Sequence, residues 1–406
     1  MTIGVGGSTI EIELATLFDM TAGAVPIALS EYRSRINKAQ DMMKLHDISA
    51  LYLNAGTNMT YFTGTVWHAS ERMVGAIIPA EGDVVYIAPA FEIGTLNQYM
   101  TIEGVVHGWE EHESPYKLFS EILDTMGVKN GRLGLDEAAP FFITNGIAKA
   151  TSNIEIINAD VITAACRMIK SASEISLMQR AKDMTLQVHK STAKILREGI
   201  STTQVAAFIN EAHIKVGAPA GSYFVIVLFG EASAYPHGVK DPQILKTGDT
   251  VLIDTGCLLH GYISDITRTY VYGEPSQRQR SVWNSEKAAQ AAAFSAAQIG
   301  ARAADVDIAA RASLEKDGFG PAYTIPGLPH RTGHGIGLDI HEWPYLNSGD
   351  ETVLAAGMCF SNEPMLCIPD EFGVRLEDHF YMTEGGPKWF TEPSHSIDDP
   401  FGSEIE

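Results

Sequence analysis

VLIDTGCLLHGYISDITRTY, residues 251–270, is the most informative segment of this 406-residue chain. TVLIDTG (250–256) and GYISDITRTYVYG (261–273) are rich in β-branched and aromatic residues, which indicates two strands joined by the short connection CLLH. Asp254 and Asp265 interrupt these apolar strands, and a hairpin can bring two such carboxylates together on one sheet face. A buried carboxylate is too costly to leave unpaired, so both side chains need partners.

The residues around this hairpin predict helices and further strands. Helical spacing occurs in four segments, which are 165–199, 201–217, 276–300 and 305–318. Ser171 and Glu174 form a capping-box pattern at the first of these helices, and Asp305 is the expected N-cap of the last. Strands resume over 358–368 and 373–383. The C-terminal part is therefore predicted to be helices packed on one face of a mainly antiparallel sheet.

The first part of the chain alternates between helical and strand patterns. Helices are expected over 31–48 and 117–128, and strands over 50–56, 75–89 (two strands around a turn) and 132–137. Such alternation favours a layered α/β domain. We expect a smaller N-terminal α/β domain over 1–165 and a larger catalytic domain over 166–406.

Composition excludes several classes of protein. The formal net charge of −21 argues against a nucleic-acid partner, because a phosphate-backbone binder needs a basic face. The chain has no uninterrupted apolar run of about 18 residues, so no membrane span is expected. The first residues lack the pattern of a signal peptide, which makes the cytoplasm the expected compartment. The four cysteines contain no CxxC pair and indicate neither a disulfide framework nor a zinc–thiolate site.

Five residue positions in the C-terminal part have the chemistry of metal ligands. They are Asp254, Asp265, His334 in HRTGHGIG, Glu363 in SNEPML and Glu377 in GVRLED. Each alone has an ordinary structural explanation, such as a turn, an exposed strand end, a solvated edge or a hydrogen-bonded histidine. Together they favour two divalent ions that share bridging oxygens and a bridging hydroxide, since a single zinc site more often uses several His or Cys ligands.

Four segments resemble the pita-bread metallopeptidase family of creatinase, prolidase and aminopeptidase P type. They are VLIDTGCLLHGYISDITRTY, HRTGHGIGLDIHEWP, AAGMCFSNEPML and GVRLEDHF. NAGTNMTYFTG and WHASERM further resemble the creatinase-type N-terminal domain, which methionine aminopeptidases lack. The resemblance implies an α+β protein, in which an antiparallel sheet covered by helices follows a smaller α/β domain.

The resemblance also implies a role for each ligand. Asp254 is expected to hold one metal, and Asp265 and Glu377 to bridge both. His334 and Glu363 are expected to hold the other metal. Glu363 should also take a proton from the attacking water and pass it toward the leaving amine. The expected cofactor is a pair of divalent ions, manganese first, with cobalt or zinc as alternatives.

Four more residues are candidates for catalysis or substrate binding. By resemblance His237, in AYPHGV, approaches the substrate, and His341, in DIHEWP, contacts the scissile carbonyl or the tetrahedral intermediate. The alternative for both is a structural turn histidine. Arg375 is expected to orient a ligand carboxylate or bind substrate, or else to be an ordinary ion-pair partner of the acidic cluster. Tyr223 is a substrate-binding candidate, with a buried core tyrosine as the alternative.

The implied reaction is metal-dependent hydrolysis of the peptide bond that precedes proline. The substrate would be a small peptide with proline at its second position, and the resemblance implies a homodimer. In one respect the chain departs from well-known prolidases, because HEWPYLNSGDETVLAAGM (341–358) lacks the arginine that binds a dipeptide's carboxylate. An Xaa-Pro aminopeptidase acting on longer peptides, or a lyase or C–N hydrolase on the same fold, is therefore the alternative. A binding module is disfavoured because such modules lose the ligands that this chain keeps.

Overall fold

The computed structural model describes residues 2–403, which form two compact units. One unit comprises Ile27–Arg167, and the other comprises Met1–Pro26 together with Met168–Glu406. The boundary after residue 167 lies two residues beyond the expected one, because Thr163 and Arg167 hydrogen-bond to side chains of the smaller unit at 2.7 and 2.9 Å.

The N-terminal residues differ more from the expected domain 1–165. Through residue 26 they belong to the larger unit. The amide of Ile3 donates to the carbonyl of Asp398 at 2.7 Å, and the amide of Gly6 donates to that of Ala193 at 2.9 Å. The first segment is therefore part of the larger unit and not of the α/β domain.

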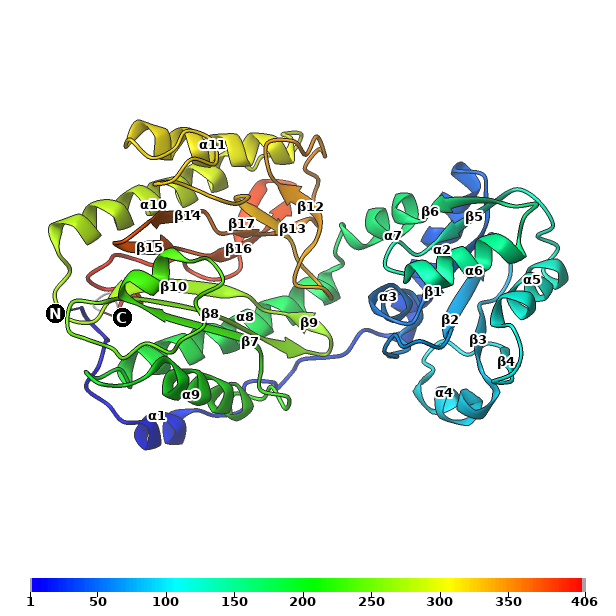
Figure 1. The fold of residues 1–406 in the computed structure, drawn as a ribbon, viewed down its shortest axis with the longest axis horizontal. Helices are drawn as coiled ribbons and strands as arrows, with labels where there is room; N and C mark the ends of the chain where they lie inside the picture. The colour runs from blue at the N-terminus through cyan, green and yellow to red at the C-terminus, as the bar shows by residue number, and fades with distance from the viewer. Residues whose placement is uncertain (1, 404–406) are drawn as a thin grey trace. The chain divides into compact units, whose positions relative to one another are not determined.

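The smaller unit has a six-stranded mixed sheet in the order β4-β3-β2-β1-β5-β6 (Figure 1). Its strands are β1 (Ile48–Asn54), β2 (Gly75–Pro79), β3 (Val85–Pro89), β4 (Val106–Trp109), β5 (Arg132–Leu135) and β6 (Glu155–Asn158). Its helices are α2 (Leu29–Leu45), α3 (Thr57–Thr63), α4 (Ile93–Tyr99), α5 (Pro115–Thr125), α6 (Phe141–Ala150) and α7 (Asp160–Arg167). Antiparallel β2 and β3 confirm the two strands predicted within 75–89, and the expected α/β domain is present.

The larger unit contains mainly antiparallel strands in three groups. In the first, β7 (Ser222–Phe229), β8 (Thr250–Leu259) and β10 (Ile266–Val271) pair in the order β10-β8-β7, and β9 (Tyr262–Ile263) pairs with β8. The second has the order β12-β11-β13-β16-β17, and the third is the hairpin β14-β15. The strands of these two groups are β11 (Gly333–Gly335), β12 (Glu342–Leu346), β13 (Cys359–Asn362), β14 (Met365–Ile368), β15 (Phe372–Arg375), β16 (Asp378–Thr383) and β17 (Gly386–Trp389).

Helices cover this unit from two sides. Helices α8 (Ala172–Lys194) and α9 (Thr202–Lys215) pack on β8 and β7, whereas α10 (Gln277–Ala296) and α11 (Ala303–Lys316) lie beyond β14 and β15 (Figure 1). A short helix α1 (Ile10–Thr16) packs against α8 and α9. The expected architecture of mainly antiparallel strands covered by helices is confirmed, and each helix pair packs on a different group of strands.

Gly256 explains how the two aspartates of the central hairpin approach each other. Strand β8 continues to Leu259, so the expected CLLH connection is mostly strand, and the turn falls at His260 and Gly261. A Cβ atom at Gly256 would lie only 1.7 Å from the carbonyl oxygen of Ser264. Only glycine permits this approach, which brings the neighbouring Asp265 into the region of β8 that carries the other aspartate.

Helix α11 begins earlier than the sequence suggests. It starts at Ala303, with Arg302 as the N-cap residue, so the prediction of Asp305 as N-cap is wrong. The Asp305 carboxylate instead accepts a hydrogen bond from the backbone amide of Arg302 at 2.9 Å. This is the second half of a capping box, in which an acidic residue in the first turn satisfies the N-cap amide.

The Ser171→Ala variant should destabilise the larger unit by about 1 kcal/mol, because the hydroxyl caps α8. Ser171 Oγ accepts from the amide of Glu174 at 3.2 Å, and the Glu174 carboxylate accepts from the amide of Ser171 at 2.9 Å. Urea unfolding followed by circular dichroism measures the change. The control is Ser34→Ala, an exposed position inside α2, and an equal loss for both variants would contradict the capping argument.

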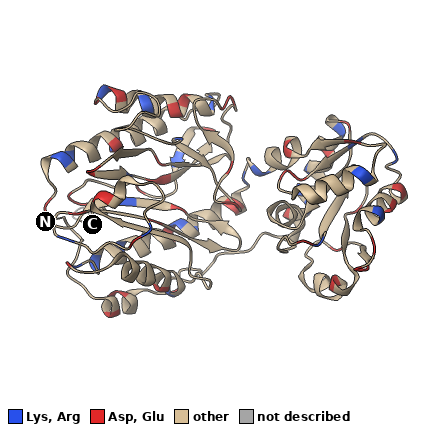
Figure 2. Cartoon of the chain, viewed as in Figure 1, with Lys and Arg blue, Asp and Glu red and all other residues tan. Residues whose placement is uncertain are grey.

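Charge is distributed over both units. Lys and Arg positions alternate with Asp and Glu positions along the helices and loops (Figure 2). Within residues 2–403, no helix has both the length and the apolar run needed to cross a membrane.

Candidate active site

The five candidate ligands come from different groups of strands in the larger unit. Asp254 lies on β8, and Asp265 lies in the link between β9 and β10. His334 is the central residue of β11, Glu363 directly follows β13, and Glu377 lies between β15 and β16. An isolated bridge between Thr267 on β10 and Glu377, directly before β16, joins the first group of strands to the second. The candidate ligands lie around this junction.

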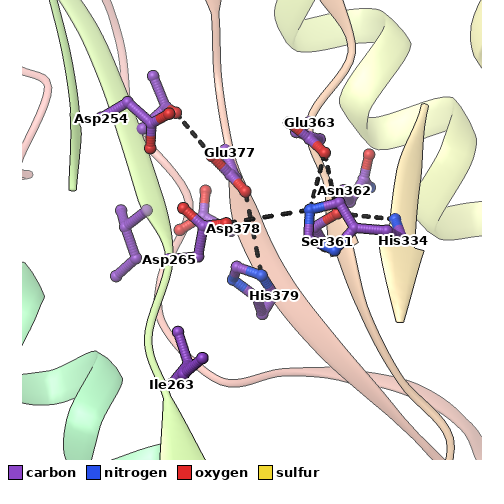
Figure 3. Close-up of polar contacts among 12 residues, drawn as sticks. Asp254, Ile263, Asp265, His334, Ser361, Asn362, Glu363, Glu377, Asp378 and His379 are labelled. Carbon is purple, nitrogen blue, oxygen red and sulfur yellow. Dashed lines mark hydrogen bonds and ion pairs between the residues drawn. The ribbon is translucent and has the colours of Figure 1, made fainter. Parts of the chain in front are cut away.

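The side chains converge closely (Figure 3). One ligand atom each from Asp265, His334 and Glu377 lie within 4.8 Å of one another. His334 Nε2 is 3.0 Å from Glu363 Oε1 and 3.9 Å from Asp265 Oδ2. The negative charge of Asp254 contributes to the raised pKa of Asp265, so these two carboxylates also lie close together. The structure therefore brings together all five residues that the sequence suggests.

The carboxylates have the chemistry of a cation site. Among the described residues, Asp254 Oδ1, Asp265 Oδ1 and Glu377 Oε1 are buried without a hydrogen-bond partner. Burial, followed by repulsion between the carboxylates, raises the pKa of Asp265 and of Glu377 well above the usual range. Divalent cations that prefer oxygen ligands would supply the missing partners and remove the repulsion, so the residues fit such ions.

The backbone sets the tautomer that His334 needs as a ligand. Its Nδ1 lies 3.0 Å from the carbonyl oxygen of Gly335, to which it can only donate. Nε2 therefore carries the lone pair, on the side of the ring that faces Glu363 and Asp265. The amide of His334 also donates to Ser361 Oγ at 2.9 Å, which holds β11 against β13. Outer hydrogen bonds of this kind orient metal-binding histidines.

Arg375 is an ion-pair partner within the cluster. Its guanidinium is buried and pairs with Asp254 Oδ2, and its Nε donates to Thr267 Oγ1 at 3.0 Å. Thr267 Oγ1 donates to Glu377 Oε2 at 2.6 Å, so one chain of contacts orients two candidate ligands. Nη1 also donates to the carbonyl of Pro236 at 3.2 Å, next to the candidate His237. The contact with Asp254 fits both an arginine that orients a ligand carboxylate and an ordinary ion-pair partner of the acidic cluster.

A second buried ion pair supports the Glu377 segment from behind. Arg268 and Asp378 are almost fully buried, and Arg268 Nη2 lies 2.7 Å from Asp378 Oδ1. Arg268 Nη1 also donates to the carbonyl of Glu377 at 2.9 Å. Asp378 accepts further hydrogen bonds from Thr391 at 3.1 Å and Gln290 at 3.2 Å. This network fixes the backbone of Glu377 in the candidate centre.

A cavity of about 470 Å³ opens beside the cluster. Its lining residues are Pro236, His237, Pro329, His330, Arg331, His341, Glu363 and Arg375. The ring centroids of His341 and His334 are 4.1 Å apart. Burial is the larger cause and the neighbouring His334 the next in lowering the pKa of His341 to about 4. His341 is thus neutral near pH 7 and can donate a hydrogen bond into the cavity. The volume lies in the range of small-molecule sites.

Sequence reasoning missed His330 and Arg331, although both belong to the quoted motif HRTGHGIG. Both residues lie a few positions before the candidate ligand His334, and this proximity in the sequence could have identified them. Tyr223 behaves differently, because its side chain is 47% exposed and it is not one of the residues that line the cavity. It is therefore no core tyrosine, and its role in substrate binding stays a prediction.

Known proteins resemble the chain over nearly its whole length. The model of metallopeptidase family M24 matches residues 176–384, and that of the creatinase/prolidase N-terminal domain matches 35–169. The Xaa-Pro dipeptidase of Pyrococcus furiosus is 30% identical, over 90% of this chain and 99% of the relative.

Two solved structures show the same architecture. The dipeptidase PepE from Mycobacterium ulcerans is 31% identical with a TM-score of 0.85, over 92% of this chain and 99% of that one. A prolidase from Thermococcus sibiricus is 29% identical with a TM-score of 0.80, over 89% and 97% of the two chains. These similarities confirm the resemblance seen in the motifs. The chain belongs to metallopeptidase family M24 and carries the creatinase/prolidase type of N-terminal domain.

Proposed function

We propose that this metallopeptidase hydrolyses the bond before proline in Xaa-Pro dipeptides. The observation that carries the proposal is the cavity of about 470 Å³, which shares Glu363 with the candidate metal ligands. A substrate in this cavity would place its scissile bond beside the ligand cluster. Relatives named as a dipeptidase and as an Xaa-Pro dipeptidase support the same substrate class.

The cofactor in this proposal is a pair of divalent ions held by Asp254, Asp265, His334, Glu363 and Glu377. Manganese is the first choice because the donor set is rich in oxygen, and cobalt or zinc is the alternative. When bound, such ions lower the pKa of water and polarise the scissile carbonyl. The other steps depend on the chain's own side chains.

Glu363 is the proposed proton carrier. Burial acts to raise its pKa, but the nearby His334, His330 and Arg375 together hold the pKa below its usual range. The side chain is therefore a carboxylate that can accept a proton from the attacking water and pass it to the departing proline nitrogen. His341, neutral near pH 7, donates a hydrogen bond to the carbonyl oxygen as negative charge develops there. His237 lines the same cavity and positions the substrate.

The first experiment compares Ala-Pro with Ala-Pro-Ala, using chelated protein before and after manganese is restored. We expect manganese-dependent release of proline from the dipeptide. Cleavage of the tripeptide alone would establish the aminopeptidase alternative. No cleavage of either peptide by metal-loaded protein would exclude the peptidase proposal and leave a lyase or C–N hydrolase. The Asp265→Ala variant removes one of the proposed metal ligands, and it should bind less manganese and release no proline.

The proposed assembly is a homodimer, and the proposed location is the cytoplasm. Sedimentation velocity at micromolar concentration tests the first of these. A single species of monomer mass would contradict it.

A further inference from the structure

Arg331 is a cation of the cavity wall without a hydrogen-bond or ion-pair partner among the described residues. It lines the cavity together with Glu363 and His341, and its side chain is partly buried. Among residues 2–403, its guanidinium makes no hydrogen bond or ion pair. The other arginine of the cavity, Arg375, is already paired with Asp254. Arg331 is thus the described arginine in this cavity that is available to an anion.

The position of Arg331 is fixed by an aromatic ring. Its guanidinium carbon lies 4.3 Å from the centre of the Tyr345 ring, in cation–π geometry. Tyr345 lies on β12, directly opposite His334 in the β11–β12 ladder. The guanidinium also lowers the pKa of His341, after the larger effects of burial and of His334. Arg331 is therefore held close to the residues proposed to act on the scissile bond.

His330 adds a second unsatisfied polar group on the same wall. Its Nδ1 donates to the carbonyl of Arg331 at 2.7 Å, and its buried Nε2 has no hydrogen-bond partner among the described residues. The tether holds the backbone of Arg331 against the cavity. The planar guanidinium with its parallel N–H groups matches a carboxylate, which it can bind through two hydrogen bonds at once.

The geometry points to Arg331 as the binding site for the C-terminal carboxylate of the Xaa-Pro dipeptide. This inference rests on the proposed function. In a dipeptide the free carboxylate lies one residue beyond the scissile bond, about 3.8 Å of backbone. Arg331 lines the same cavity as His341 and Glu363, so a dipeptide whose scissile bond lies at these two residues can reach the guanidinium with its carboxylate. Arg331 thus supplies, from the segment before β11, the charge that is missing between residues 341 and 358.

The test compares Ala-Pro with Ala-Pro amide in wild type and Arg331→Met, both loaded with manganese. We expect the variant to raise KM for Ala-Pro by about 10- to 100-fold and to leave KM for the amide unchanged. The KM of Arg331→Lys for Ala-Pro should lie between those of wild type and Arg331→Met, because lysine keeps the charge but lacks the planar pair of N–H groups. The matched control is Lys388→Met, which removes an exposed cation 5.8 Å from the Tyr381 ring and should leave both values unchanged.

Calorimetric titration with L-proline and L-prolinamide separates this inference from the proposed function. If wild type hydrolyses no Xaa-Pro peptide but binds proline more tightly than prolinamide, and loses that preference in Arg331→Met, the subsite stands without the proposed reaction. The subsite is overturned if hydrolysis occurs and Arg331→Met weakens the binding of the acid and of the amide by the same factor. It is also overturned if hydrolysis occurs and the variant weakens the binding of neither. It is overturned too if wild type shows no preference for proline. Thermal melting of the variant near wild type shows that a lost preference does not reflect misfolding.

Discussion

Replacing Glu363 by Gln is expected to lower kcat for Ala-Pro hydrolysis by about 10²- to 10⁴-fold. The side chain lies 3.0 Å from His334 Nε2 and faces the cavity, where it is the proposed proton acceptor. Glutamine keeps the shape of the side chain and one oxygen that can bind a metal ion, but it cannot accept the proton. The measurement is steady-state kinetics at saturating manganese, together with metal content determined on the same sample.

Two comparisons make this result specific. Glu384→Gln makes the same chemical change at an exposed position and should leave kcat unchanged. Metal content separates the two proposed roles of Glu363, metal ligand and proton carrier. A variant that keeps the wild-type metal content but loses turnover has lost proton transfer. A Glu363→Gln enzyme with full metal and wild-type kcat would exclude Glu363 as the proton carrier.

The sequence predicted the five candidate ligands because carboxylates inside apolar strands are rare and costly. Asp254 in VLIDTG is such a case, and Glu363 in SNEPML directly follows an apolar strand; the structure brings both into one cluster. Arg331 gave no such signal, since an arginine in a polar loop usually lies in solvent. Only the fold reveals that it lines the cavity and, among residues 2–403, has no ion-pair partner, because both facts depend on residues distant in the sequence.

Elements with strong local patterns were also predictable, while their packing was not. Ser171 and Glu174 cap α8 as expected, because a capping box depends on residues three apart in the chain. Asp305 was assigned to the wrong cap position, because an acidic residue suits both N-cap and the third helical position. The attachment of residues 2–26 to the larger unit depends on hydrogen bonds to residues such as Ala193 and Gly273, which no local pattern encodes.

Replacing Arg268 by Met is expected to destabilise the larger unit by roughly 3–5 kcal/mol, because it leaves Asp378 buried without its ion partner. Both side chains are almost fully buried, and their nitrogen and oxygen atoms are 2.7 Å apart. The variant also removes the 2.9 Å hydrogen bond to the carbonyl of Glu377. Urea unfolding measures the loss of stability, and calorimetry with manganese measures the loss of ordered ligand geometry.

The double variant Arg268→Met with Asp378→Asn decides whether the ion pair is the cause. Neutralising Asp378 removes the unpaired charge, so the double variant should be more stable than the sum of the single losses predicts. Arg278→Met breaks an exposed pair with Glu371, 3.0 Å apart, and should change stability far less. Equal losses for Arg268→Met and Arg278→Met would contradict the buried-pair argument. Strong coupling together with weakened manganese binding would instead mean that this network, which donates to the backbone carbonyl of Glu377, holds that candidate ligand in place.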